Sequence, residues 1–132
     1  MEFDHPGRMA RPRLLMAYSD SAHASHCVRQ FRRLGWEVHM VASGALAQCL
    51  AVELNPDAIV LDVDLPDESG WLSAAKILLT QPSQRVVLLA DSFDAIERER
   101  AHSLGVAGMV RREDGMADLT NLVIDRQVSV AV

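Results

Sequence analysis

Pro56–Gly70, with the sequence PDAIVLDVDLPDESG, is the most informative stretch of this chain. Residues 58–61, AIVL, form an unbroken apolar run between Pro56 and Pro66. A short apolar run bounded by residues that break regular structure is typical of a strand buried on both faces of a parallel sheet. Asp62 directly follows the run. We therefore expect Asp62 at the carboxyl end of a central strand, where ligands bind in open α/β sheets.

The rest of the chain alternates strand patterns with helix patterns. Apolar or alternating runs predict four further strands, at residues 13–19, 37–42, 85–90 and 108–111. Helical spacing, N-cap residues and terminal glycines predict five helices, at residues 21–34, 44–54, 71–80, 95–104 and after 115. The strand–helix order, repeated five times, predicts an α/β fold with a doubly wound, mostly parallel sheet covered on both faces.

Apolar positions within the predicted helices suggest which residues face the sheet. In the second helix these include Leu46 and Cys49, in the third Leu79, and in the fourth Ile96. Cys27 falls in a similar pattern in the first helix. We therefore expect both cysteines to be reduced, buried thiols.

Length and composition limit the classes of protein that fit. The 132 residues suit one domain, with a loose arm at 1–12, a folded part at 13–127 and an apolar tail at 128–132 that allows a homodimer contact. The net charge of −5 and the absence of a basic stripe disfavour direct binding of nucleic acid. No signal-peptide pattern and no membrane-length apolar window occur, so we expect a cytoplasmic protein.

The pattern around Asp62 resembles the receiver domains of bacterial two-component response regulators. It combines Pro56-Asp57 before the strand, Asp62 at its end, Pro66 four residues later and Gly70 eight residues later. The segment from Ala101 to Val110 is also similar to the end of the fourth helix and the fifth strand in that family. The resemblance extends over residues 13–127. It implies a flavodoxin-like fold with five helices and the strand order 2-1-3-4-5.

The resemblance also implies a site. Asp62 would be the phosphoacceptor, and Mg²⁺ would be bound by Asp62, by an acidic pair after the first strand and by the backbone carbonyl of Asp64. A hydroxyl at the end of the fourth strand and a lysine at the end of the fifth would contact the phosphoryl group. This chemistry is reasonable because a carboxylate accepts a phosphoryl group only when a cation offsets the incoming charge.

The acidic pair is missing from this chain. Tyr18 and Ser19 occupy its two positions, and the single acid nearby is Asp20, one residue later. Asp20 is a candidate metal ligand and also a candidate N-cap of the first helix. Asp64 and Asp91 are further carboxylates and are alternative candidates to replace the missing acidic pair.

The positions that contact the phosphoryl group are also altered. Ala90 stands at the hydroxyl position, and Ser92 follows two residues later. Met109 stands at the aromatic switch position. Arg112 replaces the lysine, which keeps the charge but changes its geometry.

Three functional hypotheses remain open. The first is a receiver in phosphorelay signal transduction that accepts a phosphoryl group on Asp62 from a histidine kinase or phosphotransfer protein and then binds a downstream protein target. The second is a pseudo-receiver, a protein-interaction module that acts without phosphorylation. The third is an enzyme or cofactor carrier, which is disfavoured because no G-x-G-x-x-G, P-loop or cobalamin motif occurs. The spacing of His23 and Cys27 allows a transition-metal site, but no other ligand accompanies them.

Overall fold

The computed structural model describes residues 11–124 and contains one parallel five-stranded sheet in the order β2-β1-β3-β4-β5. Most of the predicted arm and the whole predicted tail at 128–132 lie outside the described residues. The strands are β1 (Arg13–Ala17), β2 (Glu37–Val41), β3 (Ala58–Asp62), β4 (Val86–Ala90) and β5 (Gly108–Arg111). The flavodoxin-like fold and the strand order predicted from the sequence are therefore confirmed.

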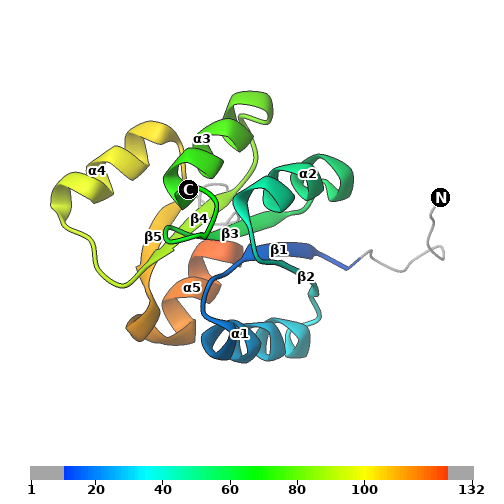
Figure 1. The fold of residues 1–132 in the computed structure, drawn as a ribbon. Coiled ribbons are helices and arrows are strands. Elements are labelled where there is room, and N and C mark those ends of the chain that lie inside the picture. Colours follow the sequence, from blue (N-terminus) through cyan, green and yellow to red (C-terminus); the bar gives the residue numbers. More distant parts are fainter. Residues whose placement is uncertain (1–10, 125–132) are drawn as a thin grey trace, which may run out of the picture.

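Helices cover both faces of this sheet (Figure 1). They are α1 (Ser21–Arg33), α2 (Gly44–Leu54), α3 (Gly70–Thr80), α4 (Ala95–Leu104) and α5 (Gly115–Ile124), with a short 3₁₀ turn, η1 (Arg112–Asp114), before α5. One hydrophobic cluster joins α1 and α5 to one face of the sheet, and a second joins α2, α3 and α4 to the other. This arrangement is doubly wound, with the sheet as the middle of three layers.

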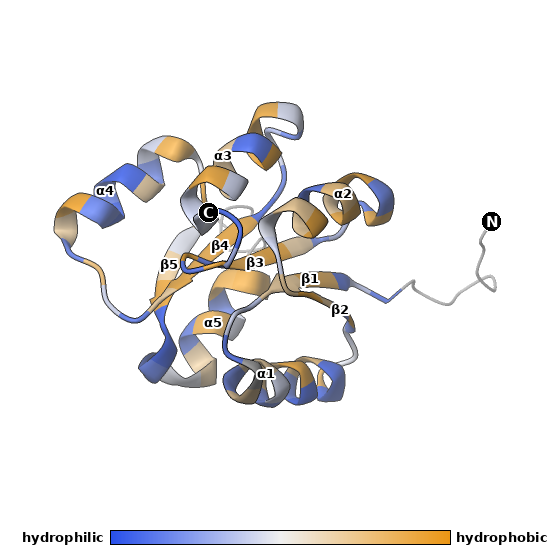
Figure 2. Cartoon of the chain, in the orientation of Figure 1, coloured by the Kyte–Doolittle hydropathy of each residue, from blue (hydrophilic) through white to orange (hydrophobic). Residues whose placement is uncertain are grey.

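The central strands are buried on both faces. In β1 and β3, Leu14 and Val60 pack in the cluster that contains α1 and α5, whereas Leu15 and Ile59 pack in the opposite cluster. All four side chains are fully buried. Burial of each such side chain contributes about 1.5–3 kcal/mol, which explains why unbroken apolar runs form these strands. Figure 2 shows hydrophobic colouring along the central strands β3 and β4.

The helices begin at polar side chains that the sequence identifies. Asp20 Oδ1 accepts hydrogen bonds from the backbone N–H groups of Ala22 (3.0 Å) and His23 (3.3 Å) at the start of α1. Asp94 and Glu97 form a reciprocal capping box at the start of α4. These caps satisfy N–H groups that a helix leaves without an internal partner.

In three helices, some of the apolar positions predicted to face the sheet are exposed instead. Alanines at positions 47 and 51 of α2 face the sheet, while Leu46 and Cys49 are exposed. In α3 the side chain of Leu79 is 83% exposed, and in α4 that of Ile96 is 71% exposed. Apolar residues occur on more than one side of α2 and α3, so hydropathy alone does not identify the buried side.

Within residues 11–124, no helix has both the length and the apolar character needed to cross a membrane.

Candidate functional site

Asp62 is the last residue of β3, and its side chain is fully buried. The register of the parallel sheet places it beside Leu89 of β4 and one residue beyond the Ala17–Leu61 pair of β1 and β3. The loops after β1, β4 and β5 consequently meet around it. Burial of a carboxylate is costly unless hydrogen bonds or a counter-charge compensate.

Both carboxylate oxygens of Asp62 have donors. Oδ2 accepts hydrogen bonds from Arg112 Nη1 (2.5 Å), from Ser19 Oγ (2.8 Å) and from the backbone N–H of Ser19 (3.3 Å). Oδ1 accepts the backbone N–H of Asp64 (2.9 Å). The donors come from the ends of β1 and β5 and from the loop after β3, so the carboxylate joins three segments of the chain.

These donors decide the ionisation state of Asp62. Burial has the largest single effect and raises the pKa of the carboxyl group. Hydrogen bonds from Arg112, Asp64 and Ser19 together outweigh burial, so the pKa of Asp62 is lower than its usual value. Asp62 is therefore a buried, ionised carboxylate at neutral pH.

Arg112 is the first residue of η1, directly after β5, and its guanidinium contacts three carboxylates. Besides the bond to Asp62, Nε lies 2.6 Å from Asp91 Oδ1 and Nη2 lies 3.5 Å from Asp64 Oδ2. The side chain of Arg112 is 14% exposed, while those of Asp64 and Asp91 are 70% and 76% exposed. Burial acts to lower the pKa of Arg112, but its bonds to Asp62 and Asp91 more than reverse that effect and raise the pKa. Arg112 is thus a permanent cation at this site.

The two positions of the missing acidic pair have different roles in the structure. Tyr18 is buried, its hydroxyl group lies 3.4 Å from Cys27 Sγ, and burial is the main reason that its pKa is raised. Ser19 donates to Asp62, a role that the sequence analysis missed. The sequence signal for this role was a serine at a position where the receiver resemblance expects an acid near Asp62. Asp20 uses Oδ1 to cap α1.

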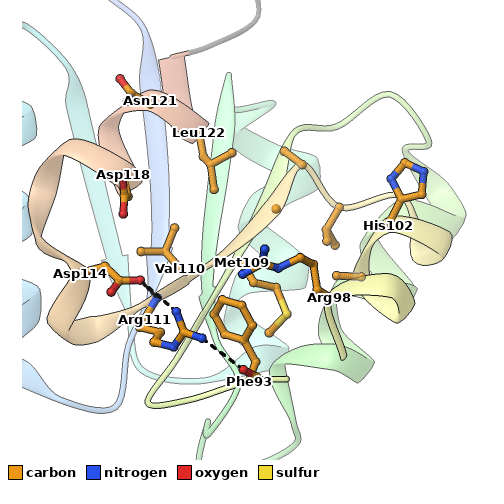
Figure 3. Close-up of a pocket in the computed structure, with 14 residues that line it drawn as sticks. Phe93, Arg98, His102, Met109, Val110, Arg111, Asp114, Asp118, Asn121 and Leu122 are labelled. Atoms are coloured by element: carbon orange, nitrogen blue, oxygen red, sulfur yellow. Dashed lines mark hydrogen bonds and ion pairs between the residues drawn. The ribbon is translucent and has the colours of Figure 1, made fainter. Parts of the chain in front are cut away.

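The altered contact positions provide few polar groups near Asp62. Ala90 is buried and has no side-chain oxygen, and Ser92 is exposed in the loop before α4. Met109 of β5 is half-buried and lines a groove of about 530 Å³ between α4 and α5 (Figure 3). Of the altered contact positions, only Arg112 has an observed bond to Asp62.

Phe93 is a second residue that the sequence analysis missed. Its ring centroid lies 4.4 Å from the guanidinium carbon of Arg111 and 5.2 Å from that of Arg98. Arg111 Nη2 also donates to the backbone carbonyl of Phe93 at 3.3 Å (Figure 3). These cation–π contacts attach the loop after β4 to β5 and α4. A lone aromatic residue in a polar loop was the signal for this contact.

The far end of the loop after β3 is bound to α2. Asp67 accepts hydrogen bonds from the backbone N–H groups of Gly44 (2.8 Å) and Ala45 (2.9 Å). Both bonds lower the pKa of Asp67, and the bond from Gly44 has the larger effect. Glu68 accepts bonds from Ser73, Gln48 and Lys76. The loop is therefore fixed at both ends, by strand ends at Asp62 and by helices at Asp67 and Glu68.

The residues present do not fit a receiver-type Mg²⁺ site. Mg²⁺ requires near-octahedral oxygen ligands, usually including carboxylates. The acidic pair is absent, Asp20 caps a helix, and Asp62 already accepts an arginine, a hydroxyl and two backbone N–H groups. Across the part of the chain that the structure describes, no three His, Cys, Asp or Glu side chains are grouped to hold a metal ion.

Comparison with curated proteins finds partial matches to two kinds of protein. The chain is 35% identical over 86 residues to a protein-glutamate methylesterase/protein-glutamine glutaminase of Anaeromyxobacter dehalogenans, covering 64% of this chain and 25% of that protein. It is 30% identical over 79 residues to the response regulator GacA of Pseudomonas aeruginosa, covering 60% of this chain and 36% of that protein. The chain thus spans about a quarter to a third of these relatives. No protein-family model matches it.

Solved structures confirm the fold. A CheY-like response regulator receiver domain protein from Methanospirillum hungatei superposes with a TM-score of 0.78 at 16% identity, covering 91% of this chain and 96% of the other. The non-phosphorylated HemR receiver domain from Leptospira biflexa has a TM-score of 0.77 at 23% identity, covering 90% and 95%. The resemblance to receiver domains that the sequence indicated is therefore confirmed, and the chain has the receiver fold.

Proposed function

We propose that this chain, which has the receiver fold, is a two-component signalling module that acts through protein contacts while Asp62 remains unphosphorylated. The observation that carries the proposal is the state of Asp62. Its carboxylate is fully buried, ionised and bonded at both oxygens, with Arg112 as its counter-charge. Asp62 then has a structural role, and the fold provides the contact surfaces.

The chemistry of phosphoryl acceptance supports this proposal. The accepting carboxylate must present an oxygen to the phosphorus atom, and a cation must offset the charge of the incoming group. Oδ2 of Asp62 already accepts three hydrogen bonds, and the residues around it do not form an Mg²⁺ site. Ala90 lacks the hydroxyl group that the receiver resemblance assigns to contact with a bound phosphoryl group.

A second candidate function is phosphoryl acceptance on Asp62 from a histidine kinase or phosphotransfer protein. It is favoured by the position of Asp62 at the carboxyl end of β3 and by Arg112, whose forked guanidinium also suits a phosphate. In this reaction an Asp62 oxygen would form a bond to phosphorus as the P–N bond of the donor phosphohistidine breaks. Attack through Oδ2 would first require loss of hydrogen bonds from Ser19 or Arg112, whereas attack through Oδ1 would compete with the backbone N–H of Asp64.

Intact-mass spectrometry distinguishes the two functions. The full chain and an Asp62→Asn control are incubated with acetyl phosphate and Mg²⁺, followed by hydroxylamine. We expect no phosphoryl adduct on either protein. A hydroxylamine-labile adduct on the parent that is absent from the Asp62→Asn variant would establish the second function and reject the first.

A further inference from the structure

We propose that Arg112 is a resident cation that takes the place of a divalent metal ion at this site and holds the carboxyl ends of β3, β4 and β5 together. The inference deepens the proposed function and rests on it in one respect, that Asp62 stays unmodified. Its evidence is the placement of one guanidinium among three carboxylates.

The contacts of Arg112 connect separate segments of the chain. Nη1 binds Asp62 at the end of β3, Nε binds Asp91 just after β4, and Nη2 lies beside Asp64 in the loop after β3. Arg112 itself directly follows β5. A planar guanidinium has donors that point in different directions, so one side chain can bind several carboxylates, as a bound cation would.

The charges explain why a cation belongs here. Asp62, Asp64 and Asp91 each place a carboxylate against a different nitrogen of the Arg112 guanidinium, and Asp62 is removed from water. Without a positive group these carboxylates would repel one another, and Asp62 would be buried without a counter-charge. Arg112 supplies that charge from within the chain, and it cannot deprotonate at accessible pH.

The same contacts disfavour a metal ion. A divalent cation at the carboxylate of Asp62 would compete with the Arg112 guanidinium for Oδ2 and would be repelled by it. Ser19, at a position of the missing acidic pair, approaches the same oxygen with its hydroxyl and N–H groups, both as donors. The groups near Oδ2 are therefore arranged to donate hydrogen bonds to the carboxylate rather than to offer oxygen ligands to a metal.

Thermal unfolding of the full chain with EDTA or with millimolar Mg²⁺ tests this inference. We compare the parent with Arg112→Met, Arg112→Lys and the control Arg29→Met, which changes an exposed arginine on α1. The Tm of the parent and of the control should be the same with Mg²⁺ and with EDTA. Arg112→Met should lower the Tm by about 5 °C or more in EDTA, and Mg²⁺ should restore part of that loss. Arg112→Lys should fall between the parent and Arg112→Met.

Several results would overturn the inference. Stabilisation of the parent by Mg²⁺ would show that the site still takes a metal, and an unchanged Tm in Arg112→Met would show that the arginine holds nothing together. Lack of any Mg²⁺ effect on Arg112→Met would show that Arg112 does not occupy a cation position. Should Arg112→Met fail to fold, Mn²⁺ binding to the parent, followed by electron paramagnetic resonance, decides the question, because we expect no bound Mn²⁺.

The failure of this inference can be told apart from failure of the proposed function. A phosphoryl adduct that forms on Asp62 in the presence of EDTA would reject the proposed function. It would leave in place the inference that the site works without a metal ion. Stabilisation of the parent by Mg²⁺ without any adduct would reject the role of Arg112 while leaving the proposed function in place.

Discussion

The two ends of the loop after β3 bind their carboxylates in different ways. At the first end, Asp62 is fully buried and its partners include the guanidinium of Arg112 and the hydroxyl of Ser19. At the second end, Asp67 is exposed and its partners are backbone N–H groups at the start of α2. The first set of bonds joins strand ends that are 43 and 50 residues apart in sequence, and the second attaches the loop to a neighbouring helix.

This difference predicts at which end of the loop a substitution destabilises the protein most. A buried charge that loses its partner retains its full desolvation penalty, whereas an exposed carboxylate that loses a partner is hydrated instead. Substitutions at the Asp62 end should therefore have large effects on stability, and substitutions at the Asp67 end should have small ones. The predictions below are ordered by the size of that effect.

The largest effect is expected for Arg112→Met. The substitution leaves the Asp62 carboxylate buried without its counter-charge, and we expect it to lower the free energy of unfolding by roughly 3–5 kcal/mol. Urea denaturation measures the change, with Arg29→Met as the control. In the double variant Asp62→Asn/Arg112→Met, the loss should be smaller than the sum of the two single losses. Additive losses would mean that Asp62 and Arg112 do not form an energetically coupled pair.

An intermediate effect is expected for Gly70→Ala, at the start of α3. A Cβ atom on Gly70 would collide with the backbone oxygen of Asp62 and would lie 2.8 Å from Val63 Cα. Because backbone atoms cannot easily move away, we expect a loss of about 1–3 kcal/mol in urea denaturation.

Gly44→Ala is the matched change at the other end of the loop. There a Cβ atom would meet side-chain atoms of Ser73 and Glu68, which can move more easily. The loss in free energy of unfolding should therefore be smaller than for Gly70→Ala. An equal or larger loss for Gly44→Ala would contradict the proposed difference between the two ends.

The smallest effect is expected for Asp67→Ala, and it should depend on pH. Because N–H groups of Gly44 and Ala45 lower the pKa of Asp67 in the folded state, its contribution to stability is present above the unfolded pKa and disappears as pH falls through the folded pKa. The difference in Tm between parent and variant should thus be constant near neutral pH and shrink below about pH 4. A difference that grows on acidification would reject this account of Asp67.

Much of the fold could be predicted from local sequence. The sequence analysis identified the fully buried runs in β3 and β4 and the N-cap candidate Asp20, because these features depend on neighbours in the chain. Helix faces were harder to predict because packing against the sheet decides them. In α2, alanines face the sheet and the larger Leu46 points outward.

The site was only partly predictable. The family resemblance placed Asp62 and Arg112 near each other, and the structure shows their contact. Ser19, Phe93 and Asp67 were not predicted as partners because their contacts join segments separated by 18 to 43 residues. Pairings of this kind depend on the register of the sheet and on the course of the loops, which local patterns do not determine.

The most direct measurement is a ¹³C NMR titration of the Asp62 side-chain carboxyl group, assigned with the Asp62→Asn variant, with and without Mg²⁺. We predict that its chemical shift remains that of an ionised carboxylate down to a pH below 3.8, the usual pKa of an aspartate, and that Mg²⁺ does not change it. A titration at or above that pH, or a displacement of the signal by Mg²⁺, would contradict the conclusion that Arg112 is the cation of this site.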